Sequence, residues 1–236
     1  MRDKVRIRFR KDGDLRLVSH HDLMQCFERM LRRAEIPFCT TNGFNPQPRL
    51  VFALSLPLGI VGADEVVELE MKEELPAEEV CRRLRQQAPA GLDFLSARRI
   101  DPKAHGQPCR VRYRVEVPMP FREHLPAQID RLLACSEHWI ERTRPHARRL
   151  NLRAFLADLR LVGPHLEMDI RVTPQGTARA EEVLAALGLR ELPDNGAILE
   201  RTKLELDDEL STPGANEVPT GPASINSTAR PVKGNA

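Results

Sequence analysis

The first residues whose types and spacing could do chemistry are two histidines next to a serine and an aspartate, Ser19-His20-His21-Asp22. Ser19 with Asp22 three residues later is typical of a helix N-cap, so His20 lies in the first turn of a predicted helix. A helix N-terminus attracts anions, and a neutral histidine there can transfer a proton. No second acid or base follows at a recognisable spacing. A solvated histidine beside a capping aspartate is therefore the simpler interpretation.

The segment PFCTTNGFNPQPR (37–49) is longer than a helix-to-strand connection needs to be. Long ordered loops in compact domains are often functional. Its candidate binding residues are Gly43, Phe44, Asn45, Pro46 and Arg49. Two interpretations are open for Phe44: it stacks on a base beside a cation, or it plugs the hydrophobic core. Under the first, we expect Phe44, Arg49 and His20 to line one concave surface.

Alternating arginines mark two predicted strands, VRIRFR (5–10) and VRYRV (111–115). This alternation is the period of a strand with one buried face, so the arginines form an outward row. Such a row is a surface for a nucleic-acid backbone, which makes Arg6 and Arg8 candidate binding residues. The competing interpretation is cross-strand ion pairing with acidic residues on the same face. Those acidic residues are Glu68 and Glu70 in the first half, and Glu167 and Asp169 in the second.

The densest positive charge lies in the run RTRPHARR (142–149), which is either an RNA-contacting loop or a solvated one. Its candidate binding residues are Arg148 and Arg149. The chain contains 30 arginines and 6 lysines. Arginine's planar fork suits phosphate better than a point charge does, although a GC-rich genome produces the same bias.

The five cysteines are widely spaced, and the sequence contains no CxxC and no CxxxCxxC pattern. We therefore expect no metal site and no cofactor. No apolar stretch reaches 18 residues, and the N-terminus lacks the apolar core of a signal peptide. These features favour a cytoplasmic protein that does not bind a membrane. Aromatic residues make up only 4% of the chain, so the strands lack the usual base-stacking surface.

The order of expected elements is the same in both halves. In the first half, strand 5–10, helix 20–36, strands 50–56 and 65–71, a helix from residue 76 and strand 92–100 follow one another. In the second, we expect strand 111–117, helix 122–135, a strand around Trp139, an irregular stretch 144–157, strand 165–172, helix 178–187 and strand 197–206. The predicted fold is α+β, with two tandem ferredoxin-like (βαββαβ) units over 1–104 and 105–210. Residues 211–236, rich in Pro, Gly and Ser, are predicted to be a disordered tail.

Several motifs carry a family resemblance. The stretches GDLRLVSHHDLMQCFERMLRRAEIP (13–37), NGFNPQPRLVFALSLPLG (42–59) and VTPQGTARAEEVLAALGL (172–189) resemble the radical SAM-linked family of unknown function. The resemblance implies a radical SAM protein as partner rather than a SAM cofactor in this chain. The residues that match the family pattern are Ser19, His20, Asp22, Gly43, Phe44, Pro46 and Pro48. His21 stands where an apolar residue is usual, and Gln47 where histidine is common.

The sequence thus favours a non-enzymatic accessory protein of a radical SAM system that binds or presents RNA, with structured RNA as the expected partner, through a basic surface. Two alternatives stay open. The tandem layout resembles, in architecture only, the endoribonucleases that process CRISPR transcripts; under that alternative His20 is the catalytic residue of metal-independent RNA cleavage. The other alternative is an adaptor that only docks on the radical SAM protein.

Overall fold

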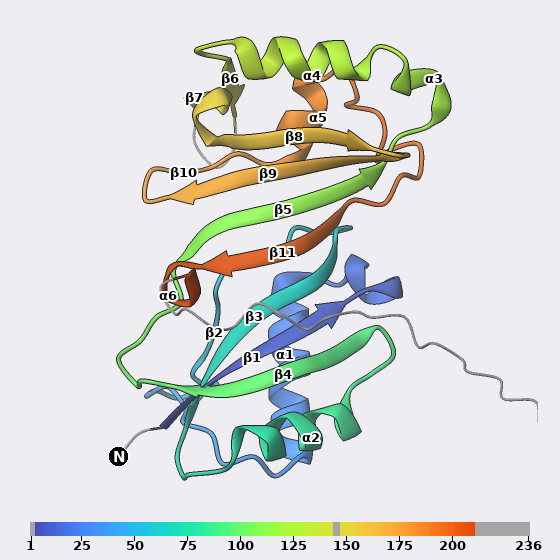
Figure 1. Cartoon of the computed structure of the whole chain (residues 1–236). Coiled ribbons are helices and arrows are strands. Elements are labelled where there is room, and N and C mark those ends of the chain that lie inside the picture. The colour runs from blue at the N-terminus through green and yellow to red at the C-terminus, as the bar shows by residue number, and fades with distance from the viewer. Residues whose placement is uncertain (1–2, 144–146, 211–236) are drawn as a thin grey trace, which may run out of the picture.

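The computed structural model describes residues 3–143 and 147–210 (Figure 1). The strands are β1 (Asp3–Lys11), β2 (Leu50–Phe52), β3 (Val61–Met71), β4 (Leu92–Ile100), β5 (Pro108–Glu116), β6 (Trp139–Arg142), β7 (Arg148–Asn151), β8 (Leu156–Val162), β9 (His165–Thr173), β10 (Gly176–Thr177) and β11 (Glu200–Leu206). The helices are α1 (His20–Arg33), α2 (Ala77–Gln87), α3 (Met119–Arg122), α4 (Leu125–Ala134), α5 (Ala180–Ala186) and α6 (Asp207–Leu210). Short 3-10 turns are η1 (Gly13–Leu17) and η2 (Leu152–Phe155). Within the described residues, no helix is both long and apolar enough to cross a membrane.

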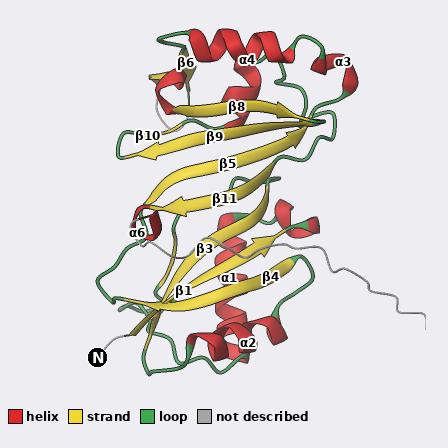
Figure 2. Cartoon of the chain, viewed as in Figure 1, coloured by secondary structure: helices red, strands yellow, loops and turns green. Residues whose placement is uncertain are grey.

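The protein is a mixed α+β structure built on one large, mostly antiparallel sheet that runs through both halves (Figure 2). In the first half the strands lie in the order β2–β3–β1–β4, and in the second β8–β9–β5–β11, with antiparallel neighbours throughout. The two halves join where β11 runs parallel to β3, with Glu200 opposite Val61 and Arg201 opposite Gly62. The second half therefore repeats the strand order of the first, and its last strand, β11, pairs with β3 and so joins the two halves into one sheet.

Helix α1 begins and ends where local chemistry requires. The Ser19 hydroxyl accepts the Asp22 amide at 3.2 Å, which caps the N-terminus. Leu23, Phe27 and Leu31 repeat every four residues and are all buried against the sheet. The helix ends just before Glu35, which has a positive φ of 51°. The spacing-based expectation of a capped helix is confirmed.

Each half has its own hydrophobic core. The first lies between β1, β3 and β4 and the helices α1 and α2, with Phe9, Phe27 and Phe94 near its centre. The second lies between β5, β8, β9 and β11 and the helices α4 and α5. Leu56 and Ile60, from the connection between β2 and β3, are buried in this second core. The halves are therefore joined by side-chain packing as well as by strand pairing.

The second half departs from the sequence-based prediction at its second strand. The strand around Trp139 is β6, which pairs with β7 in a separate two-stranded sheet. The neighbour of β9 is instead β8, preceded by η2. The turn η2 and the first two residues of β8 fall in the stretch 144–157 that was expected to be irregular, and no element was expected over 158–162. A register shift between Leu156 and Asp158 breaks the period of two, so the alternation that reveals other strands is missing there. The expected tail, 211–236, lies outside the described residues.

Candidate functional site

The arginine row of β1 is covered at Arg6 and Arg8, whereas the Arg10 side chain is 41% exposed. Arg6 is 1% exposed, and its Nε and Nη2 donate to Glu68 Oε1 on β3 at 3.0 and 2.7 Å. Lys4, on the same face, lies 3.1 Å from the other oxygen of Glu68, and the Gly106 amide donates to Oε1 at 2.9 Å. The expected cross-strand pairing of Arg6 with Glu68 is confirmed. Glu70, by contrast, pairs with Arg49.

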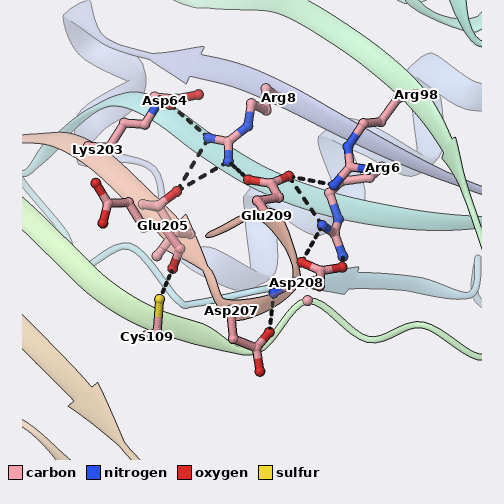
Figure 3. A network of polar contacts seen from close by, with 12 residues as sticks. Arg6, Arg8, Asp64, Arg98, Cys109, Lys203, Glu205, Asp207, Asp208 and Glu209 are labelled. Atoms are coloured by element: carbon pink, nitrogen blue, oxygen red, sulfur yellow. Dashed lines mark hydrogen bonds and ion pairs between the residues drawn. The ribbon is translucent and has the colours of Figure 1, made fainter. Parts of the chain in front are cut away.

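Helix α6 lies over this row from more than 190 residues further along the chain (Figure 3). Nη1 and Nη2 of Arg6 donate to the two carboxylate oxygens of Asp208, each at 2.8 Å. Glu209 accepts from Arg98 of β4 at 2.8 Å and also from Arg8. Arg8 contacts Asp64 as well, at 2.7 Å. The prediction that Arg6 and Arg8 form an exposed row was therefore wrong: α6 and the 101–107 segment cover that face.

The close ion pairs shift several pKa values. Burial alone would lower the pKa of Arg6, but its hydrogen bonds to Asp208 and Glu68 outweigh burial and raise it. The Arg6 hydrogen bond lowers the pKa of Asp208. For Glu209 and Glu68, burial favours the neutral acid, yet the surrounding cations outweigh it and lower both pKa values. All three carboxylates are thus held ionised by the arginines.

The arginine row of β5 is exposed. The side chains of Arg110, Arg112 and Arg114 are 40%, 49% and 44% exposed. Arg112 and Arg114 pair with Glu205 and Glu200 of β11 at 2.8 and 2.6 Å, and Arg110 lies 3.3 Å from Asp169. A hollow of about 270 Å³ opens on this face. Its lining includes Arg112, Arg114, Asp158, Arg160, Glu167 and Asp169.

A buried ion pair sits at the junction of the two halves. Arg201 of β11 is 1% exposed; its Nε donates to Glu65 Oε1 at 2.7 Å, and Nη2 donates to the other oxygen. Two further N–H groups of the guanidinium, one on Nη1 and one on Nη2, donate to the carbonyl oxygens of Ser55 and Leu54. A Cβ at Gly62 would lie 2.5 Å from the Glu65 side chain, so glycine leaves room for this pair. These contacts fix β11 against β3.

His20 and the 37–49 loop do not form one surface. The His20 ring packs edge-on against Phe52, with ring centroids 5.0 Å apart, on the side of the sheet covered by α1. Arg49 lies three residues before Phe52, roughly 10 Å along the strand, and an odd separation places its side chain on the opposite face. There it pairs with Glu70 at 3.2 Å. The expected concave surface is therefore absent. Asp22 serves the N-cap described above.

The two ends of the 37–49 loop lie beside β3, where the Cys39 amide donates to the Glu70 carbonyl and the Glu70 amide donates to the Arg49 carbonyl. The Arg49 amide donates to Cys39 and the Thr41 amide to Gln47, which pinches the base of the excursion. Gly43 has a φ of 137°, a conformation that favours glycine. Asn45 and Pro46 are exposed, and Phe44 is fully exposed. Phe44 is therefore no core plug.

The β6–β7 hairpin carries the remaining sequence-based candidates. Trp139 is 50% exposed, and the Arg149 guanidinium lies 5.1 Å from the centre of its ring. Arg142 anchors the hairpin to α5, donating to Glu182 at 2.5 and 2.6 Å and to the Thr177 carbonyl at 2.7 Å. Within the described part of the chain, Arg148 and Arg149 form no ion pair with a carboxylate. Residues 144–146 of the basic run lie outside it.

Sequence reasoning missed two features. The first is the acidic turn α6, whose sequence, DDEL, shows a concentration of charge but not where it docks. The second is Trp139, which the sequence pattern indicates only as part of a strand, although it precedes the basic run by three residues. Across residues 3–143 and 147–210, no group of three metal-ligating side chains is present.

Comparisons with known proteins give a family and little more. No curated protein matches the sequence. A crystal structure of an unknown protein from Galdieria sulphuraria is similar over 87% of this chain and 99% of that chain, at 13% identity and a TM-score of 0.28. The model of the family described as "Uncharacterized protein conserved in bacteria (DUF2344)" matches residues 4–185. Since that match spans most of the chain, the protein belongs to the DUF2344 family.

Proposed function

We propose that this protein binds RNA as a non-enzymatic accessory protein, and that the β6–β7 hairpin makes the decisive contact. The observation that carries the proposal is the half-exposed Trp139 ring with Arg149 stacked on it. An aromatic ring beside a cation is the arrangement that binds an unpaired base next to its phosphate. Arg148 is also exposed and forms no ion pair with a carboxylate among the described residues, but it lies on the opposite face of the hairpin, with Leu150, so Arg149 is the cation next to the ring.

The hairpin is held rigidly enough to present these groups. The Trp139 indole N–H donates to Glu137 at 2.9 Å, which orients the ring. Arg142, at the loop end of β6, holds the hairpin to α5 through a two-point contact with Glu182. A preorganised aromatic loses little conformational entropy when a base stacks on it.

Three further parts of the proposal concern the fold, the partner and the location of the protein. The repeated strand orders β2–β3–β1–β4 and β8–β9–β5–β11 support two ferredoxin-like units, over 1–104 and 105–210. The family resemblance in the sequence supports a radical SAM protein as partner, which co-purification from the native host would test. The third part is a cytoplasmic location, which is supported by the five cysteines, all of them free thiols, as expected in a reducing compartment.

Filter binding of a structured RNA with a single-stranded loop, at two salt concentrations, tests the RNA proposal. We expect measurable binding at low salt that weakens steeply with salt, because phosphate contacts release counterions. Trp139→Ala is expected to weaken binding by about 1–3 kcal/mol, as for other base-stacking aromatics. Phe121→Ala removes an aromatic ring that is similarly exposed, at 45%, and serves as the matched control. Absence of binding at low salt, or equal losses in both variants, would contradict the proposal.

A further inference from the structure

Three arginines from two strands converge on α6. Arg6 and Arg8 come from β1 and Arg98 from β4, and all three donate to the carboxylates of Asp208 or Glu209 (Figure 3). Guanidinium groups bind phosphate with the same two-point geometry as carboxylate. The side chains that α6 contacts are therefore those that would bind a phosphate group.

The strands alone do not balance these charges. Five cations surround the site: Lys4, Arg6, Arg8, Arg98 and Lys203. The strands supply two carboxylates to them, Glu68 to Lys4 and Arg6, and Asp64 to Arg8 and Lys203. Helix α6 adds Asp208 and Glu209. Without α6, the site would hold an excess of three positive charges.

The contacts of α6 with the sheet are polar. The helix is a single turn, and its one large apolar side chain, Leu210, is 61% exposed. The preceding Leu206 is fully buried, so the anchor to the core ends before α6 begins. Besides its ion pairs, α6 makes a backbone hydrogen bond from the Asp207 amide to the Gln107 carbonyl at 3.0 Å. A segment held by such polar contacts can be exchanged for another anion at modest cost, since little apolar surface is uncovered.

We propose that Arg6, Arg8 and Arg98 form an anion site for a small polyphosphate, and that the carboxylates of α6 occupy it as an internal competitor. Binding moves α6 away and places phosphate oxygens where those of Asp208 and Glu209 lie. The buried ion pair of Arg6 with Glu68 stays in place and keeps that guanidinium oriented. This site is separate from the Trp139 hairpin, and it does not depend on RNA binding.

Calorimetric titration with inorganic pyrophosphate tests the proposal on the full chain. The double variant Asp208→Asn, Glu209→Gln weakens the competitor, so we expect it to bind pyrophosphate at least about tenfold more tightly than the wild type. Adding Arg98→Gln, at a side chain that is 52% exposed, should reverse most of this gain. Trp139→Ala should change nothing, which separates this result from the RNA proposal.

The matched control removes the same charge elsewhere. Glu73→Gln with Glu78→Gln neutralises two exposed carboxylates outside the α6 contacts. An equal gain in this control would mean that net charge alone is responsible, and would overturn the proposal. Equal affinity of the wild type and the α6 double variant would also overturn it. If the double variant does not fold, the single change Glu209→Gln keeps the Asp208–Arg6 contact and should still tighten binding.

Discussion

The two halves of this protein present the same row of arginines on their first strands and use it in opposite ways. On β1, Arg6 and Arg8 lie under α6 and Arg6 is 1% exposed, while Arg10 at the end of the row is 41% exposed. On β5 the corresponding side chains are 40–49% exposed and pair with β9 and β11 at the surface. Local sequence is nearly identical in the two rows. What differs is whether a distant acidic segment folds back over the row.

This difference changes what each arginine contributes. A buried guanidinium has lost its water and depends on its carboxylate partners, so removing it leaves those partners uncompensated. A surface guanidinium keeps most of its hydration, and its ion pair contributes little. The same residue type, at the same place in a repeated pattern, is thus structural in one half and available to solvent in the other.

The largest expected effect comes from breaking the buried row. Arg6→Met leaves Glu68, which is 3% exposed, paired with Lys4 alone among the cations of the described residues, and removes the contact of Arg6 with Asp208. Removing one partner of a buried pair typically costs about 3–5 kcal/mol, so we expect a loss of this size in the free energy of unfolding. Urea denaturation measures it. A loss below about 1 kcal/mol would mean that Arg6 contributes no more to the free energy of unfolding than the surface arginines of β5 do.

An acid titration of stability sharpens the same comparison. The pKa values of Glu68, Asp208 and Glu209 are lowered in the folded state, so their contribution is present above their ordinary values and is lost as the pH falls. We expect the wild type to lose stability below about pH 4.5. In Arg6→Met, Glu68 is still buried but has lost its main cation, so protonating it costs the variant less than the wild type. The difference in the free energy of unfolding between variant and wild type should therefore narrow over the same pH range. A constant difference would contradict the assignment.

The smallest effect is expected on the exposed row. Arg112→Met removes a surface pair with Glu205, and such pairs contribute about 0–1 kcal/mol. This loss of stability should also vanish at high salt, where surface charges are screened. Urea denaturation at two ionic strengths checks both points. A loss similar to that of Arg6→Met would show that the two rows are equivalent despite their different exposure.

Much of the fold could be predicted from periodicity. The alternation in β1, β3, β5 and β9 is regular because one face of each strand packs on a core, and the Ser19–Asp22 spacing locates the start of α1. The strand β8 was missed because its register shift interrupts that alternation.

Much less of the candidate site could be predicted. Patterning shows which side of β1 faces away from its helices, but not that α6 returns over that side. A four-residue acidic turn has no apolar period, and its docking depends on charges far away in sequence. The expected meeting of His20 with Arg49 failed for a simpler reason: an odd number of residues between Arg49 and Phe52 puts their side chains on opposite faces.

The junction between β3 and β11 has a consequence for how the chain is made. At the end of β3 where Val61 and Gly62 lie, the edge is completed by Glu200 and Arg201. The ribosome must add about 130 residues after β3 before that partner emerges, which takes roughly 7–26 s at 5–20 residues per second. During that interval the nascent first half exposes an unpaired strand edge and the Glu65 carboxylate awaiting Arg201. During synthesis there is therefore a stage at which all residues of the N-terminal half have been made but β3 still lacks its neighbour β11.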